Sequence, residues 1–247
     1  MIEVRDVTKK FGNQKVLQGV SLDIRRGEAV VIIGRSGGGK SILLKHLIGL
    51  LQPDSGTIRV DGEDITTMNE RSLLRVRRKY GMLFQMAALF DSLTVEENVG
   101  FVLRRQGVES DAEIRRRVAE ALEMVELPGI GHKMPSELSG GMRKRVGLAR
   151  AIVYRPEIVL YDEPTTGLDP IAADNIDRLI RRVWETLHVT SIAVTHDMKS
   201  ARTISNRILM LHEGRIYSEG PTSEILESTD PVIYRFVNGI STPQKSE

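Results

Sequence analysis

The sequence predicts an α/β fold in which buried strands alternate with helices and a helical block interrupts the alternation. Ala29–Ile33 is a continuous apolar run, typical of a strand covered on both faces of a sheet. A glycine-rich turn follows it and leads into an apolar helix over Lys40–Leu51. Helical periodicity fills residues 89–154, and strand–helix alternation returns over residues 158–204. These observations favour an α/β core with a mostly helical insertion.

The N-terminal segment predicts half-buried strands. Ile2 and Val4 alternate with charged residues, and residues 20–24 repeat the same period of two. Residues 53–56 predict a turn before a short strand over Thr57–Val60.

The remaining elements follow from their periodicity. Within the helical block we expect helices over 94–105, 111–127 and 139–154, separated by turns. After the block we expect strands over 158–161 and 190–194, helices over 172–187 and 198–204, and a hairpin over 207–218. Two short C-terminal helices are expected over 221–227 and 231–238.

Composition excludes several classes of protein. The 35 Lys and Arg residues nearly balance the 33 Asp and Glu residues, which does not indicate a nucleic-acid binder. The absence of cysteine excludes disulfide scaffolds, thiolate metal sites and cysteine nucleophiles. No apolar stretch is long enough for a membrane span, and the N-terminus carries no signal-peptide pattern. We therefore expect a soluble intracellular protein.

A phosphate-binding loop is predicted between the buried strand and the helix that follows it. Its residues fit the pattern G-x-x-x-x-G-K-[ST] and are Gly34, Arg35, Ser36, Gly37, Gly38, Gly39, Lys40 and Ser41. Glycines let successive backbone N–H groups point inward at a helix N-terminus, which forms an anion site. Lys40 is expected to reach the β- and γ-phosphates, and the Ser41 hydroxyl to ligate Mg²⁺. The loop predicts a nucleoside triphosphate without distinguishing a kinase from a GTPase, motor or pump.

Acidic and imidazole side chains end two further predicted strands. Asp162 and Glu163 follow an apolar run, and carboxylates at this end of a parallel strand face the crevice of the phosphate loop. Asp162 is expected to hold Mg²⁺, and Glu163 to orient or deprotonate the attacking water. His196 ends the next strand, where it can donate a hydrogen bond to a γ-phosphate oxygen.

A second anion site is predicted where Ser139, Gly140 and Gly141 precede a helix. A serine N-cap and two glycines expose backbone N–H groups at the positive end of the helix dipole. Two anion sites for one nucleotide suggest that the second site serves a nucleotide held by another copy of the chain.

In this arrangement the sequence resembles the ATP-binding cassette (ABC) ATPases over essentially its whole length to Gly220. The motifs that carry the resemblance, in the order of that family, are the phosphate loop, Gln85, the segment Leu138–Met142, the pair Asp162 and Glu163, the segment Gly167–Asp169, and His196. The resemblance implies a P-loop NTPase fold with a RecA-like core, an N-terminal antiparallel β subdomain and an α-helical subdomain. It further implies one ABC ATPase domain over residues 1–240, with the helical subdomain at about 89–154 and a polar tail over 241–247.

The resemblance also implies residue roles. Ser139, Gly140 and Gly141 would contact the γ-phosphate of ATP bound to the opposite subunit, and Asp169 would lie at the dimer seam. Gln85 would touch Mg²⁺ or the attacking water and respond to a membrane partner. Phe11 would stack on adenine, although an edge-strand aromatic is nearly as good an interpretation.

A narrower resemblance concerns a subfamily. Met142 replaces the glutamine that usually ends the signature, and this region and Phe84–Asp91 resemble the MlaF-like ATPases of Mce/Mla phospholipid transport systems. This implies ATP and Mg²⁺ as cofactors and three partners: a second copy of the chain, a membrane permease and lipid-binding Mce-type subunits. It places the chain on the cytoplasmic face of the cell membrane, with no direct contact to nucleic acid. An ABC ATPase of a non-transport system, such as iron–sulfur assembly or DNA repair, is the alternative.

Overall fold

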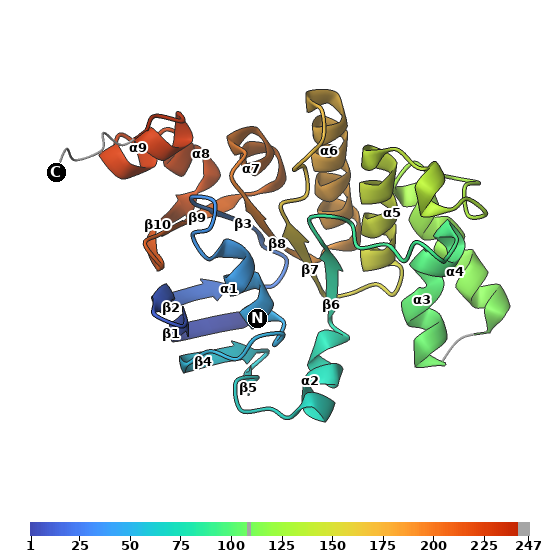
Figure 1. The fold of residues 1–247 in the computed structure, drawn as a ribbon, viewed down its shortest axis with the longest axis horizontal. Coiled ribbons are helices and arrows are strands. Elements are labelled where there is room, and N and C mark those ends of the chain that lie inside the picture. Colours follow the sequence, from blue (N-terminus) through green and yellow to red (C-terminus); the bar gives the residue numbers. More distant parts are fainter. Residues whose placement is uncertain (108–109, 242–247) are drawn as a thin grey trace. The chain divides into compact units, whose positions relative to one another are not determined.

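The chain folds as a mixed α/β structure in the computed structural model, which describes residues 1–107 and 110–241 (Figure 1). Two compact units are formed, Met1–Leu73 with Val194–Glu247, and Leu74–Ala193. The helices α3, α4 and α5 of the expected helical block belong to the second unit. The single domain over 1–240 stays a prediction, and the predicted tail beyond Ser241 lies outside the described residues.

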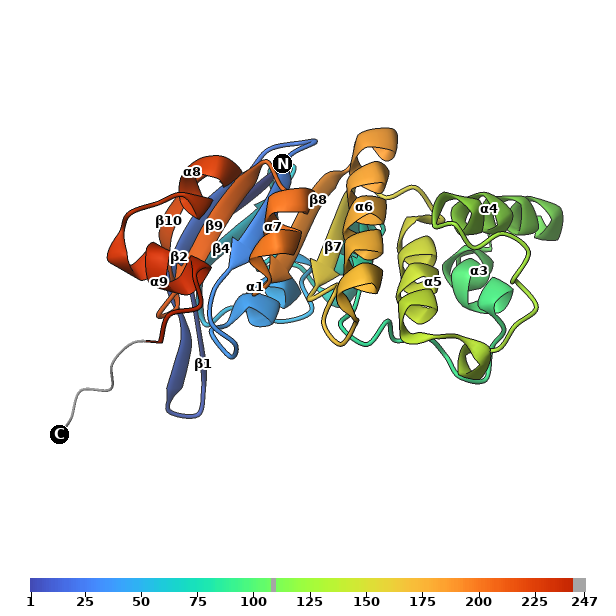
Figure 2. The same cartoon turned by 90° about the horizontal axis from the view of Figure 1, so that it is seen from above.

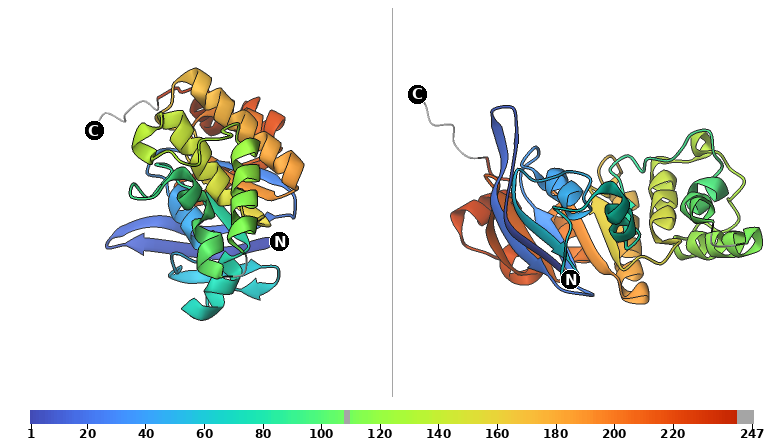
Figure 3. Two further views of the ribbon diagram at one scale, coloured as in Figure 1. Left: turned by 90° about the vertical axis from the view of Figure 1, so that its right-hand side faces the viewer. Right: turned by 90° about the horizontal axis from the view of Figure 1, so that it is seen from below.

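An antiparallel sheet with the strand order β2-β1-β4-β5 forms one part of the first unit. The strands are β1 (Ile2–Phe11), β2 (Gln14–Ile24), β4 (Ser55–Val60) and β5 (Glu63–Asp64). β1 and β2 form a long hairpin in which Ile2 lies opposite Ile24 and Phe11 opposite Gln14 (Figure 3). The apolar residues of the predicted alternation are buried on one side of this sheet. The half-buried N-terminal strands are therefore confirmed.

The phosphate loop of the first unit lies between β3 (Ala29–Ile33) and α1 (Lys40–Leu47). Every residue of β3 is buried, as the apolar run predicts. β3 pairs in parallel with β9 (Arg207–His212), which pairs antiparallel with β10 (Arg215–Pro221). α1 ends earlier than the predicted Leu51 because Gly49 adopts a φ of 67° and turns the chain.

Three short helices complete the first unit. They are α7 (Met198–Ile204), α8 (Thr222–Leu226) and α9 (Pro231–Val237). α8 packs on β10, and α9 packs on α8, so that the C-terminal helices lie beside the β9–β10 hairpin (Figure 2).

The second unit combines buried strands with a cluster of helices. β6 (Tyr80–Leu83) and β7 (Ile158–Asp162) pair in parallel and are fully buried. β8 (Thr190–Thr195) leads the chain back to the first unit. The helices are α3 (Val95–Gln106), α4 (Asp111–Met124), α5 (Gly140–Ile152) and α6 (Pro170–Leu187), with a 3₁₀ turn over Pro135–Glu137. α3, α4 and α5 pack on one another, as Figure 2 shows.

Two strands were not predicted from the sequence, because β5 and β6 are too short for a periodic signal. α2 (Glu70–Arg77) is rich in charged residues. Gly81 in β6 has a packing reason, because a Cβ there would lie 2.1 Å from the Ala151 carbonyl oxygen. The backbone of β6 therefore packs tightly against α5.

Polar side chains fix the helix starts. Thr94 caps α3 by accepting a hydrogen bond from the Glu97 N–H at 3.2 Å, and the Glu97 carboxylate accepts one from the Thr94 N–H at 2.8 Å. This reciprocal capping satisfies N–H groups that the helix leaves unpaired. Ser139 caps α5, as predicted.

Candidate functional site

The phosphate loop of the first unit has the backbone that a bound phosphate requires. Gly39 is the N-cap of α1 with a φ of 96°, and no side chain caps this helix. Gly34 has a φ of 155°, and a Cβ there would lie 2.3 Å from the Leu211 carbonyl oxygen in β9. Glycine is thus required at both ends of the loop, and the loop leads into a helix N-terminus that no side chain caps, which is the kind of position where proteins bind anions.

Lys40 supplies the positive charge of this loop. Its side chain is 5% exposed, and Nζ donates to the carbonyl oxygens of Gly34 at 2.9 Å and Arg35 at 3.2 Å. A phosphate oxygen is a stronger acceptor for an ammonium than a neutral carbonyl, so Lys40 is suited to bind a phosphate placed in this loop. The cradle of backbone N–H groups and one ammonium fits a triphosphate.

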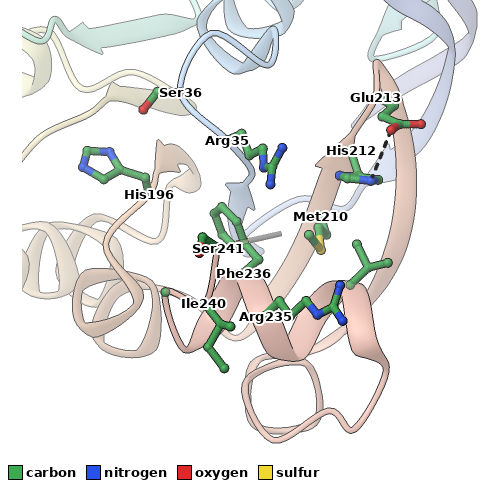
Figure 4. Close-up of a pocket in the computed structure, with 12 residues that line it drawn as sticks. Arg35, Ser36, His196, Met210, His212, Glu213, Arg235, Phe236, Ile240 and Ser241 are labelled. Atoms are coloured by element: carbon green, nitrogen blue, oxygen red, sulfur yellow. Dashed lines mark ion pairs between the residues drawn. The ribbon is translucent and has the colours of Figure 1, made fainter. Parts of the chain in front are cut away.

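A cavity of about 580 Å³ joins this loop to His196 (Figure 4). Arg35, Ser36 and His196 line it together with the β9–β10 hairpin and the C-terminal segment, all within the first unit. The turn that carries His196 is fixed by Asp197, whose Oδ1 accepts hydrogen bonds from the N–H groups of Lys199 at 2.8 Å and Ser200 at 3.2 Å. The structure therefore brings His196 to the phosphate loop, as predicted.

Other charged groups border the same cavity. His212 and Glu213 form an ion pair at 3.8 Å, drawn in Figure 4, and Arg235 and Phe236 of α9 face it from the opposite wall. No sequence pattern indicates these residues, because their position depends on how α9 folds back.

The acidic pair lies at the end of β7 in the second unit. Asp162 is 8% exposed, and Glu163 has a left-handed φ of 47°. Thr166 holds the Glu163 carboxylate through a hydrogen bond from Oγ1 to Oε2 at 3.3 Å. The left-handed backbone at Glu163 follows directly on the last residue of β7 and is strained for a residue other than glycine.

Lys144 of α5 lies beside this pair and was missed by sequence reasoning. Its side chain is 5% exposed, and Nζ donates to the Glu163 carbonyl oxygen at 3.3 Å. Burial lowers the pKa of Lys144 to about 8, and the nearby charges of Asp162 and Glu163 offset part of this effect. The lysine thus contributes positive charge next to the carboxylates.

The predicted second anion site is built at the start of α5. The Ser139 Oγ accepts a hydrogen bond from the Met142 N–H at 3.2 Å, which confirms the serine cap. Ser139, Gly140 and Gly141 line a cavity of about 250 Å³ with Asp169. Asp169 Oδ1 accepts hydrogen bonds from the N–H groups of Ile171 and Ala172, both at 3.0 Å, and so caps α6. The structure brings these predicted residues together within the second unit.

Gln85 lies in an exposed loop directly after β6. The next residues of this loop, Ala87 and Ala88, have left-handed φ angles of 60° and 50°. Beside them is a groove of about 450 Å³ with aromatic walls. The aromatic residues that line it are Tyr80, Phe84, Phe90, Phe101 and Tyr154. Sequence reasoning did not find this groove, because its walls come from β6, α3 and α5.

Phe11 ends β1 in the first unit and is 46% exposed. The Lys9 ammonium lies 5.7 Å from the centre of its ring. An exposed aromatic face is available for stacking, and its role toward adenine stays a prediction.

The described residues contain no cluster of His, Asp or Glu side chains that could hold a metal ion by itself. Within residues 1–107 and 110–241, no group of three or more His, Asp or Glu side chains is placed to hold a metal ion. Ser41 belongs to the first unit and Asp162 to the second, and their roles as Mg²⁺ ligands stay predictions.

A loop that cradles phosphate, an acidic pair after a buried strand and a serine-capped signature helix define a nucleotide-hydrolysing cassette. Residues 17–166 match the family model described as ABC transporter. The chain belongs to the ABC transporter family and is an ATP-binding subunit with ATPase activity.

Relatives and solved structures agree with this membership. The chain is 43% identical to the ATP-binding protein mkl of Mycobacterium leprae, which is named for ribonucleotide transport; the match covers 96% of this chain and 69% of mkl. It is 39% identical to the ATP-binding protein MlaF of the intermembrane phospholipid transport system of Haemophilus influenzae, over 98% of this chain and 91% of MlaF.

A solved ATP-binding cassette dimer in a post-hydrolysis state, bound to ADP and Pi, superimposes with a TM-score of 0.82 and 35% identity. That match covers 90% of this chain and 99% of the solved one. The predicted fold class is therefore confirmed. ATPase domains of this family work as dimers with membrane permease partners. No helix over residues 1–107 and 110–241 has the length and apolar character to span a bilayer.

Proposed function

We propose that this ATPase powers phospholipid trafficking between membranes, coupled to a permease on the cytoplasmic face of the cell membrane. The observation that carries the proposal is the match to MlaF over nearly the whole of both chains. Met142, in the place of the usual signature glutamine, supports the same branch. Because mkl is named for ribonucleotide transport, the identity of the cargo needs a direct test.

The chemistry proposed for each residue is one of position and charge, because phosphoryl transfer needs little else. Lys40 and the N–H groups of the phosphate loop bind the β- and γ-phosphates, and Phe11 stacks on adenine. Glu163 orients or deprotonates the attacking water, while His196 donates to a γ-phosphate oxygen. Mg²⁺, held through Ser41, Asp162 and Gln85, would neutralise charge on the phosphate oxygens.

The composite site is proposed to form between two copies arranged head to tail. Ser139, Gly140 and Gly141 of one copy contact the γ-phosphate of ATP held by the phosphate loop of the other, and Asp169 lies at their seam. Two features support this arrangement. Ser139 and Asp169 are exposed, and they line one cavity within their unit.

The aromatic groove is the proposed docking site of the permease. Phe84, Met86 and Phe90 are 36%, 85% and 45% exposed, which is unusual for large apolar side chains around one loop. Phe84 and Met86 flank Gln85 in the sequence, so a permease segment seated there would contact the loop that carries a proposed catalytic residue. This groove favours transport over the alternative of a non-transport ABC ATPase. Mce-type lipid-binding subunits are proposed as further members of the complex.

The general-base assignment is tested with Glu163→Gln. This variant is expected to bind ATP and to form a stable dimer, because its shape and hydrogen-bonding groups are nearly kept, while ATP turnover falls by about 10²-fold or more. Glu185→Gln, an exposed acid on α6, serves as a matched control and should hydrolyse ATP normally. Undiminished turnover in Glu163→Gln would remove Glu163 from this role.

The cargo is tested by purifying the tagged chain with its complex from detergent-solubilised membranes. A co-purifying permease and bound phospholipid, identified by mass spectrometry, are the expected result. A permease complex that carries a different cargo would contradict phospholipid transport. Recovery with only soluble scaffold proteins or DNA would support the non-transport alternative.

A further inference from the structure

The loop after Gln85 holds a backbone conformation that needs support. Ala87 and Ala88 both lie in the left-handed region, with φ angles of 60° and 50°. In this region the Cβ of an alanine crowds the following carbonyl oxygen, and two consecutive residues double the strain. Such a turn persists only where surrounding groups hold it.

The Arg150 side chain of α5 supports this turn through two hydrogen bonds. Its Nη1 donates to the Ala88 carbonyl oxygen and its Nη2 to the Ala87 carbonyl oxygen, both at 2.6 Å. A planar guanidinium can satisfy two adjacent carbonyls at once, which a flexible ammonium cannot do with the same geometry. The two strained residues are therefore fastened by a single side chain.

The backbone of α5 also contacts this loop, at Gly147, about one helical turn before Arg150. Gly147 of α5 approaches it so closely that a Cβ there would lie 2.9 Å from Leu83 Cδ1 and 3.2 Å from Ala87 Cβ. Ala87 itself is 1% exposed. The backbone of α5 is thus packed directly on the loop, and Arg150 holds the far side of the turn.

The helix that holds this loop is the one that Ser139 caps. Ala88 and Arg150 also line the aromatic groove. A movement of the turn by a segment in the groove would therefore pull on α5, and a movement of α5 would shift the turn and Gln85 with it.

We propose that Arg150 is a positioning residue that couples the aromatic groove to ATP turnover by holding the Ala87–Ala88 turn against α5. The proposal rests on the proposed function in one respect, namely that a permease segment occupies the groove and Gln85 acts on ATP. The hold on the turn itself is independent of that function.

The test uses the complex with its permease and three variants. Arg150→Gln removes the two-carbonyl contact, Arg150→Lys keeps the charge, and Arg150→Gln with Ala88→Gly removes the contact but relieves the strain. Arg116→Gln, an exposed arginine on α4 paired with Glu113 and Glu120, is the matched control. The readouts are amide hydrogen exchange of residues 84–91, ATP affinity, and ATP turnover with and without the permease.

In Arg150→Gln we expect amide exchange of residues 84–91 to rise about 10-fold or more, because the turn opens locally. Permease-stimulated turnover should fall by about 10- to 100-fold, since a small displacement of a positioned group has that effect. ATP affinity should stay within about 2-fold, because the phosphate loop is untouched. Arg150→Lys should lie between, and Ala88→Gly should restore part of the lost stimulation because glycine adopts the left-handed conformation without strain.

Unchanged exchange and unchanged stimulation in Arg150→Gln would overturn the proposal. If that variant does not fold, Arg150→Lys decides: reduced stimulation at normal ATP affinity supports the proposal, and wild-type stimulation overturns it. If the wild-type complex shows no permease-dependent turnover, the proposed function fails, whereas the exchange of residues 84–91 still tests the hold of Arg150 on the turn.

Discussion

The starts of α1 and α5 are both glycine-flanked helix N-termini, and they are prepared for an anion in different ways. At α1 the N-cap is Gly39, no side chain caps the helix, and the Lys40 ammonium is buried within the loop. At α5 the Ser139 hydroxyl already accepts the Met142 N–H, and the cap is exposed.

The difference shows which site can be formed by one chain. The phosphate loop of the first unit carries its own positive charge and leads into a helix that no side chain caps, so it can bind phosphate before a partner arrives. At the start of α5 the Ser139 hydroxyl already accepts one backbone N–H within the single chain, and the phosphate proposed to bind there would come from another copy. Substitutions in both regions probe this difference.

The largest effect is expected for Lys40→Met. Loss of the ammonium that donates to the loop carbonyls of Gly34 and Arg35 should lower ATP turnover by about 10²- to 10³-fold and weaken ATP binding. Lys45→Met, on the same helix, controls for the loss of a lysine. Binding of a fluorescent ATP analogue and phosphate release measure both effects. Equal behaviour of the two variants would mean that α1 binds phosphate through its backbone alone.

The second contrast is between glycines. Gly39→Ala should destabilise the fold by about 1–3 kcal/mol, because its φ is 96° and a Cβ would lie 2.9 Å from Val16 Cγ1. Gly141→Ala should leave stability unchanged or slightly raised, because its Cβ would meet only the Ala172 Cβ at 3.6 Å. It should nevertheless reduce turnover if a γ-phosphate approaches there.

Thermal unfolding and ATPase assays on both glycine variants separate these effects. A Gly141→Ala variant with full turnover would argue against phosphate contact at α5. A Gly39→Ala variant as stable as the wild type would mean that the loop relaxes around the added methyl group.

A smaller effect is expected for Ser139. Ser139→Ala removes the cap and should cost about 1 kcal/mol of stability. Ser139→Asp keeps a capping oxygen and should preserve stability, yet its negative charge opposes phosphate and should abolish turnover in the dimer. Chemical denaturation and ATP turnover measure the two consequences. Full activity of Ser139→Asp would be inconsistent with a γ-phosphate at this position.

The smallest effect concerns pH. The pKa of Lys144 is about 8 in the folded chain because of burial, against 10.5 as its ordinary value. Between these values the unfolded chain binds more protons, so this lysine makes stability rise with pH from 8 to 10.5. Lys144→Met lacks this contribution, and its stability relative to the wild type should therefore fall over that range. Denaturation in EDTA at several pH values tests it; a constant difference would contradict the shift.

Local chemistry explains what the sequence could predict. The phosphate loop, the Ser139 cap and the acidic pair each depend on neighbours along the chain, and the structure has them where the pattern places them. Lys144 and Arg150 could not be predicted, because their roles arise from carbonyls 19 and 62–63 residues away. Nothing about alanine indicates a left-handed turn, so Ala87 and Ala88 gave no signal. The early end of α1 depended on Gly49 and on its packing against Leu73.

The Ser139 hydroxyl can both accept and donate hydrogen bonds. A serine oxygen accepts through lone pairs and donates through one proton, and the cap uses only a lone pair. The proton is still available to an incoming phosphate oxygen, so binding need not disturb the helix. A carboxylate in the same place would cap equally well but would have no proton to offer. Serine can therefore cap the helix of its own chain and, in the proposed dimer, donate a hydrogen bond to the nucleotide of the other copy.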